Sequence, residues 1–164
     1  MSERESKTSV PDPGTETGAR EGASEKAEER VRESFAKQGI MKLLGAEVVE
    51  VAEGRCVIEV PYSDELTQQQ RYFHGAVAGA IGDSAGGYAA LTLAPPDREV
   101  LTVEYKVNFL APAWGERLVA RGEVITAGGR LFVCKAEVVA ISAEGEETPC
   151  AALQQTLSTT SAEA

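Results

Sequence analysis

Asp83 is the residue of this sequence that most clearly invites a chemical explanation. It is the only Asp, Glu, Lys or Arg between His74 and Pro95, within the run HGAVAGAIGDSAGGYAALTLA (74–94). Burying a carboxylate among Ala, Gly, Ile and Val is costly and raises its pKa. Isolated ionisable groups in apolar surroundings are therefore candidates for functional sites. The structural alternative is a buried Asp that caps a helix break at Gly82 or satisfies local amides.

His74, the only histidine of the chain, precedes Gly75 at the expected start of a helix. The first amides of a helix have no internal acceptor and carry partial positive charge. The amides of Gly75 and its neighbours could therefore polarise a carbonyl oxygen, as an oxyanion hole does. His74 itself could equally be a cap-like residue of the preceding loop.

The spacing of His74 and Asp83 separates the two groups. They are nine positions apart, which on a helix puts them on opposite faces and about 13.5 Å apart along the axis. One copy of the helix cannot easily aim both at one substrate atom, whereas two antiparallel copies related by a two-fold axis could. The spacing therefore favours an active site shared across a dimer interface.

The 74–94 run predicts one long buried helix, because it is too long for a typical strand. It contains glycines at positions 75, 79, 82, 86 and 87. Each glycine lowers helix propensity by up to about 1 kcal/mol relative to alanine. Such a helix must recover that cost by packing, so we expect a curved sheet to approach its backbone closely. Pro95 and Pro96 end the helix.

The segment before this run divides in two. Residues 1–24 contain no Leu, Ile, Phe, Trp or Tyr, which predicts a disordered acidic tail. A helix over about 25–37 places Ala27, Val31 and Phe35 on one face. Residues 40–44 form a short apolar link. The folded domain is therefore expected to span 25–158, with a frayed end at 159–164.

Alternation of apolar and polar residues predicts six strands, over about 46–52, 55–61, 101–109, 116–126, 130–142 and 148–158. The clearest of them is expected to bury one face that carries Leu101, Val103, Tyr105, Val107 and Phe109. The last four strands suggest an antiparallel meander. Together, these elements predict an α+β fold in which a curved antiparallel sheet of five or six strands wraps a long central helix.

Composition excludes several classes of function. The formal net charge of −10 and the pI of about 4.7 argue against nucleic acid and anionic membranes as partners. The scattered residues Cys56, Cys134 and Cys150 are typical of a reducing cytoplasm, and a single His without CxxC argues against a structural zinc site. Residues 2–30 are too polar for a signal peptide, and 74–94 is too rich in Gly and Ala to span a bilayer.

Two other patterns in the sequence could carry catalysis. Residues 82–86 satisfy GxSxG, the nucleophile elbow of α/β-hydrolases, around Ser84. That elbow requires a preceding strand and a histidine later in the chain, but the only one, His74, comes first. A Cys–His nucleophile pair stays open, with a small buried cysteine as the commoner outcome. No P-loop or GxGxxG is present.

The sequence His74-Gly75-Ala76, followed by Asp83, resembles the HGG…D signature of hot dog-fold acyl-CoA thioesterases of the PaaI-like (phenylacetate-pathway) group. The strand LTVEYKVNFLAPA (101–113) and its downstream hairpin resemble the same family. The similarity covers roughly residues 35–158. Ala76 departs from the pattern, because the family usually has a second glycine there; the family contact at this position runs through backbone amides.

The resemblance implies a role for five residues. Asp83 matches the acidic residue that acts as general base for water or as nucleophile on the thioester carbonyl. Gly75 matches the residue whose amide binds the thioester oxygen, and His74 matches the histidine that supports this loop. Gln68 corresponds to an Asn or Gln near the leaving sulfur or the attacking water, and Thr102 to a Ser or Thr that positions water.

Coenzyme A would then enter as part of the substrate, with no separate cofactor. Its phosphates need cationic contacts, for which the candidates are Arg71, Lys106, Arg117, Arg130 and Lys135; each could instead be an ordinary solvated charge. The resemblance also implies a homodimer or homotetramer. The alternatives are a hot dog hydratase or dehydratase and a non-catalytic acyl-CoA-binding protein.

Overall fold

The computed structural model describes residues 13–161, with side chains from residue 24 onward. Residues 1–12 of the predicted disordered tail and residues 162–164 of the predicted frayed end lie outside the described residues. None of the described helices is both long and apolar enough to cross a membrane.

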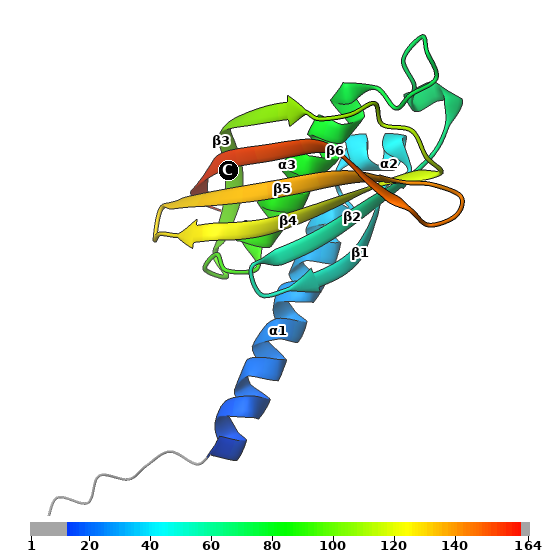
Figure 1. The fold of residues 1–164 in the computed structure, drawn as a ribbon. Helices are drawn as coiled ribbons and strands as arrows, with labels where there is room; N and C mark the ends of the chain where they lie inside the picture. The colour runs from blue at the N-terminus through cyan, green and yellow to red at the C-terminus, as the bar shows by residue number, and fades with distance from the viewer. Residues whose placement is uncertain (1–12, 162–164) are drawn as a thin grey trace, which may run out of the picture.

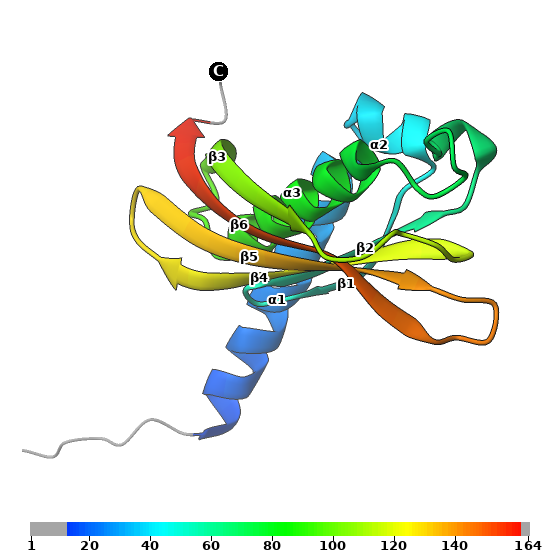
Figure 2. The same cartoon turned by 45° about the horizontal axis from the view of Figure 1, so that its top comes forward.

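A six-stranded antiparallel sheet curves around the long helix α3 (Figure 1, Figure 2). The strands are β1 (Glu47–Ala52), β2 (Arg55–Pro61), β3 (Arg98–Phe109), β4 (Arg117–Ala127), β5 (Leu131–Ile141) and β6 (Glu147–Ser161). The helices are α1 (Pro13–Phe35), α2 (Gly39–Leu44), the short 3-10 helix η1 (Asp64–Leu66) and α3 (Gly75–Leu91). This arrangement confirms the predicted α+β architecture and the hot dog fold that the resemblance implied.

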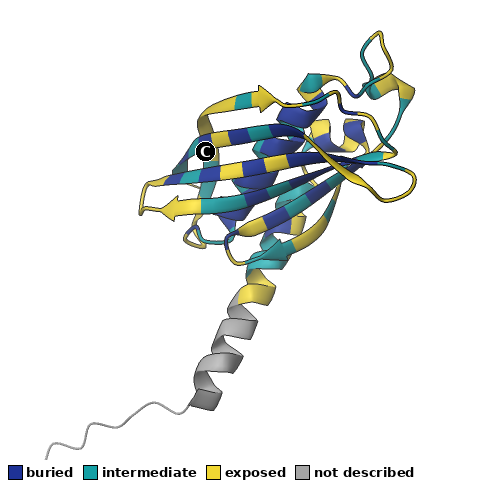
Figure 3. Ribbon diagram, viewed as in Figure 1, coloured by how far each residue is buried: buried dark blue, intermediate teal, exposed yellow. Residues whose placement is uncertain are grey.

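The glycines of α3 allow the close approach that its composition predicted. A Cβ atom on Gly82 would lie 2.7 Å from the Leu153 side chain of β6, and one on Gly86 would collide with the Gln155 amide of the same strand. Strand β4 approaches through Gly122, where a Cβ would meet the backbone of α3. The glycines thus lower the helix propensity of α3 but allow the sheet to pack closely against it. Most residues of the helix are buried (Figure 3).

The strand order is β1-β2-β4-β5-β6-β3, so the predicted meander of the last four strands is wrong for β3. Strand β3 pairs with β6 and forms one edge of the sheet. Residues 110–116 carry the chain back over β6 and β5 to β4, a distance of about 14 Å that seven extended residues easily span. Strand β6 continues to Ser161, beyond the expected end at 158, because β3 provides pairing partners from Arg98 onward.

The prediction that β3 buries five apolar residues on one face is also wrong. A bulge interrupts the register between Thr102 and Glu104, so the alternation shifts by one residue. Beyond the bulge Phe109 lies over the start of α3, but before it Thr102 turns toward the helix. Leu101 and Val103 are 61% and 62% exposed. Bulges commonly re-aim side chains in this way.

The two N-terminal helices differ from their predicted bounds. Helix α1 begins at Pro13, inside the segment predicted as a disordered tail and twelve residues before the expected start at 25. Helix α2 replaces the expected apolar link, since Met41 and Leu44 are three residues apart and both are buried. Gly45 ends α2 in the left-handed conformation, with φ of +65°.

Candidate active site

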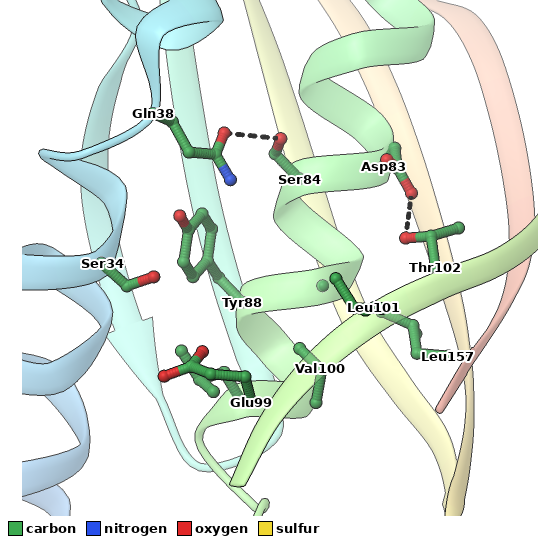
Figure 4. A pocket seen from close by; sticks show the side chains of 12 residues that line it. Ser34, Gln38, Asp83, Ser84, Tyr88, Glu99, Val100, Leu101, Thr102 and Leu157 are labelled. Carbon is green, nitrogen blue, oxygen red and sulfur yellow. Dashed lines mark hydrogen bonds between the residues drawn. The ribbon is translucent and has the colours of Figure 1, made fainter. Parts of the chain in front are cut away.

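Asp83 lies in the middle of α3 and lines a cavity of about 300 Å³ between α3, β3 and the end of α1 (Figure 4). Ser34, Gln38 and Glu99 line its far side, so the cavity is polar as well as apolar. The helix is continuous through Asp83, and the carboxylate bonds to no helix amide among the described residues. The alternative in which Asp83 caps a helix break is therefore wrong.

The Asp83 carboxylate is held through one of its two oxygens. Thr102 Oγ1 donates a 2.8 Å hydrogen bond to Oδ1, and Gln155 Nε2 donates to the same oxygen at 3.2 Å and to the Asp83 main-chain oxygen at 3.0 Å. Within the part of the chain that the structure describes, Oδ2 has no hydrogen-bond partner. One oxygen is thus fixed, and the other is free to accept a proton.

Burial raises the pKa of Asp83, and the hydrogen bond from Thr102 lowers it by favouring the ionised form. Burial is the larger of the two effects. A carboxylate with a raised pKa is a stronger base near neutral pH than a solvated one. The surroundings of Asp83 therefore suit proton abstraction.

The start of α3 forms a second cluster. His74 is the N-cap residue, and its Nδ1 accepts a 3.0 Å hydrogen bond from the Ala76 amide. The Gly75 amide has no hydrogen-bond partner among the described residues. Gly75 and Gln68 line one cavity of about 570 Å³, and the Phe109 ring of β3 lies directly against Gly75. This cluster offers an unused amide donor beside a cavity.

The five predicted site residues therefore form two half-sites in one chain. Thr102 and Asp83 make the first, and Gln68, His74 and Gly75 make the second. Gly75 and Asp83 are eight positions apart on the helix, about 12 Å along the axis. One chain therefore does not bring all five residues together.

The structure removes the nucleophile-elbow alternative. Residues 82–86 lie inside α3 rather than at a turn between a strand and a helix, which that motif requires. The Ser84 hydroxyl is directed at Gln38 Oε1, at 3.5 Å, rather than at a histidine (Figure 4). The GxSxG match is therefore coincidental.

The cysteines do not suit nucleophilic chemistry. All three are buried, and burial raises the pKa of Cys56 and Cys134 to about 12 and that of Cys150 to about 11. Since the thiolate is the reactive form of cysteine, these side chains are inert at neutral pH. His74, in contrast, is exposed at the start of α3. The open alternative of a Cys–His pair is thus unsupported.

The cationic candidates for coenzyme A contacts divide into two groups. Three already pair with carboxylates, as Arg71–Asp64 at 3.0 Å, Arg117–Glu59 at 3.0 Å and Lys135–Glu123 at 3.2 Å. Lys106 on β3 and Arg130 in the β4–β5 turn make no ion pair within residues 24–161. These two are the more available cations.

Sequence reasoning missed Gln155. It is fully buried in β6, with 0% of its surface exposed, between the inward-facing residues Leu153 and Leu157. A polar residue at an inward position of an otherwise apolar strand face is the signal that could have revealed it.

Comparison with known proteins supports the resemblance to hot dog-fold thioesterases. Residues 70–145 match the Thioesterase superfamily. A putative esterase of Saccharolobus solfataricus is 34% identical over 108 residues, which cover 65% of this chain and 76% of that protein. A 1,4-dihydroxy-2-naphthoyl-CoA hydrolase of Listeria monocytogenes is 28% identical over 90 residues, or 55% and 73% of the two chains.

A solved structure has a higher sequence identity to this chain than these two relatives. The crystal structure of a thioesterase family protein from Silicibacter pomeroyi superposes with a TM-score of 0.80 at 41% identity, and the match covers 82% of this chain and 98% of that one. The fold and these similarities confirm the resemblance drawn from the HGA…D pattern. The chain belongs to the thioesterase superfamily.

Proposed function

We propose that this protein is an acyl-CoA thioesterase, which hydrolyses the thioester of an acyl- or aryl-CoA to the free acid and coenzyme A. The observation that carries the proposal is the half-buried Asp83 carboxylate, with one oxygen fixed by Thr102 and the other free beside a cavity. The Listeria monocytogenes relative, named as a CoA hydrolase, supports a coenzyme A ester as substrate.

The chemistry needs two contributions. Asp83 Oδ2 takes a proton from water while the water oxygen attacks the thioester carbonyl, or the carboxylate attacks that carbon itself and water then hydrolyses the resulting mixed anhydride to free the acid and the carboxylate. The Gly75 amide donates to the developing oxyanion, which collapses to expel the coenzyme A thiolate, and the proton passes to that thiolate. A general base typically contributes about 10²–10⁴-fold and an oxyanion donor about 10²–10³-fold. Gln68 lies beside Gly75, where it can bind the leaving sulfur or the water.

The complete site requires a second copy of the chain. Strand β3 contacts both half-sites, because Thr102 bonds to Asp83 and Phe109 lies against Gly75. Antiparallel pairing of two β3 edges about a two-fold axis near Tyr105 places Thr102 opposite the partner's Phe109. Asp83 then lies beside the partner's Gly75, and each dimer holds two identical composite sites.

The exposed residues of β3 support this pairing. A 12-residue edge strand offers unpaired backbone groups that another strand can bond. Leu101 and Val103 leave apolar side chains exposed along it, and a partner strand would cover them. The apolar pattern that predicted a buried strand is then satisfied in the dimer rather than in the single chain.

Coenzyme A contacts and cellular location follow from the same proposal. Lys106 and Arg130 are the cations we expect to meet phosphates, with Arg71 as a third if its exposed ion pair opens. Hydrolysis needs only water besides the substrate. Three free cysteines fit a reducing cytoplasm, where we expect the protein to act.

The experiment that tests the function is a thiol-release assay across short, medium, long and aryl acyl-CoAs. A thioesterase releases one coenzyme A thiol for each acid formed. A hydratase or dehydratase would release no thiol, and a binding protein would bind the same compounds without turnover. The buried cysteines should not react with the dye, so the signal reports the product alone.

The shared site has its own test. Gly75→Pro removes the N–H of one half-site and Asp83→Asn disables the other, so each variant alone should be nearly inactive. Random mixing of the two chains by co-expression yields half heterodimers, each with one intact site, and so about a quarter of wild-type activity. Activity no higher than that of the separate variants would contradict the shared site while leaving the thioesterase proposal to the assay above.

A further inference from the structure

We propose that Gln155 is a positioning residue that holds the Asp83 carboxylate in its reactive orientation, a role that rests on the function proposed above. No comparison and no sequence motif points to Gln155. The proposal is carried by its burial, its two hydrogen bonds and the space that α3 leaves for it.

Burial sets Gln155 apart from the other polar side chains. It is 0% exposed, and no other amide or charged side chain within residues 24–161 is buried. Its neighbours on the inward face of β6, Leu153 and Leu157, both pack against glycines of α3. An apolar residue would continue that pattern, so packing alone does not account for a glutamine here.

The hydrogen bonds fix which end of the amide faces Asp83. Gln155 Nε2 lies 3.0 Å from the Asp83 main-chain oxygen and 3.2 Å from Oδ1. Both are acceptors, so a rotated amide would set its own oxygen against two others. Because Gln155 donates to both the main-chain oxygen and Oδ1 of Asp83, it restrains rotation of the carboxylate. Thr102 bonds to the same Oδ1, which leaves Oδ2 toward the substrate.

The contact between Gln155 and Asp83 is accompanied by two unfavourable features. Gln155 Oε1 is buried without a hydrogen-bond partner among the described residues, and unsatisfied buried acceptors are uncommon. Gly86 is also required, because any side chain there would collide with the Gln155 amide. The hydrogen bonds that Gln155 Nε2 makes with Asp83 explain why a polar side chain is present at this position.

The decisive variant is Gln155→Met, which keeps an unbranched side chain of similar length but removes the donor. We expect kcat to fall about tenfold or more, the range for losing a hydrogen bond to a charged group, while KM stays within about twofold. The acid limb of the pH–rate profile should move to higher pH, because the Asp83 carboxylate loses a donor that favours its ionised form.

Gln154→Met is the matched control. It makes the same change one residue earlier on β6, on the opposite and exposed face, and should alter neither kcat nor the pH profile. The proposal would be overturned if Gln155→Met lost activity while its pH–rate profile and the titration midpoint of Asp83 stayed as in the wild type. Gln155 would then act only through packing.

A measurement on the wild-type protein needs neither a variant nor turnover. In NMR titrations, the side-chain amide signals of Gln155 should move with the same midpoint as the Asp83 carboxyl carbon. Separate midpoints, or amide signals that do not respond, would overturn the proposal even if Gln155→Met fails to fold. If the protein released no thiol from any acyl-CoA, the proposed function would fail, whereas this titration would still decide whether Gln155 holds Asp83.

Discussion

Thr102 Oγ1 lies 2.8 Å from Asp83 Oδ1 and joins the edge strand β3 to the middle of helix α3. The hydroxyl faces the helix because a bulge at the next residue shifts the alternation of β3. The same strand segment exposes apolar side chains at the edge of the sheet. The proposed catalytic half-site and the proposed dimer contact therefore depend on one local irregularity.

Replacing Asp83 with Asn should nearly abolish turnover and leave the fold intact. The amide keeps the size of the carboxylate and can still accept from Thr102, but it cannot take a proton, so we expect kcat to fall by at least about 10²-fold. Thiol release and circular dichroism together check this outcome. Ser84→Ala, at the next position of α3, should change kcat less than tenfold; wild-type turnover in Asp83→Asn would remove the carboxylate from the mechanism.

The same variant should also be more stable than the wild type at neutral pH. Because burial raises the pKa of Asp83 above its ordinary value of 3.8, the folded state binds the proton more tightly than the unfolded state. Stability then falls as the pH rises from about 3.8 through the folded pKa, and the cost persists at pH 7. Asn carries no such cost.

The measurement is thermal unfolding of both proteins from pH 3 to pH 8. The melting temperature of Asp83→Asn should exceed that of the wild type at pH 7, and the difference should disappear near the acid end of the range. A variant that is less stable at pH 7 would show that the charged carboxylate is favourably placed in the fold.

Thr102→Val tests the hydrogen bond to Asp83. The hydroxyl favours the ionised carboxyl, so its loss should raise the pKa of Asp83 further. We expect kcat at pH 7 to fall by about tenfold and to recover partly at higher pH. Thr102→Ser keeps the donor and should behave like the wild type. An equal loss in both variants would assign the effect to packing.

The sequence was sufficient to predict the helix that carries Asp83. The length of the 74–94 run and the prolines after it predicted α3, which the structure has over Gly75–Leu91. Helical geometry also separates Asp83 from His74, and the site shared across a dimer that this spacing favours stays a prediction. The prediction of the helix succeeded because it depends on the local sequence pattern, which a sequence shows directly.

The bulge and Gln155 could not be found in the same way. A bulge adds one residue to a strand without altering the sequence alternation, which placed Thr102 on the outward face. The alternation with Leu153 and Leu157 places Gln155, rather than Gln154, on the inward face, but it does not indicate which group the amide contacts. Gln155 meets Asp83 across 72 positions of the chain, a contact that no local pattern indicates.

Gly75→Pro tests the proposed oxyanion donor by removing the amide proton. Proline is well tolerated at the first helical position, and His74 already has the extended conformation, with φ of −65° and ψ of 138°, that a following proline requires. We expect kcat to fall by about 10²–10³-fold. Because any Cβ at this position lies 2.8 Å from the Phe109 ring, Gly75→Ala is the control for crowding. Equal losses in the two variants would exclude the amide as the donor.

Val103→Lys tests the edge of β3 as the dimer contact. Val103 lies at the bulge and is 62% exposed in the single chain, so a lysine there should cost the isolated fold little. In a paired edge the charge would be brought against the partner strand, which strongly disfavours association. We expect sedimentation to show monomers, and hydrolysis to fall in parallel, because separated half-sites cannot share a substrate.

Val49→Lys provides the comparison. Val49 is 50% exposed on β1, the strand at the opposite edge of the sheet. The same charge placed there should leave both the dimer and its activity intact. If Val103→Lys remained an active dimer, the subunits would have to meet through another surface, and the composite site would need a different geometry to bring Asp83 to the partner's Gly75.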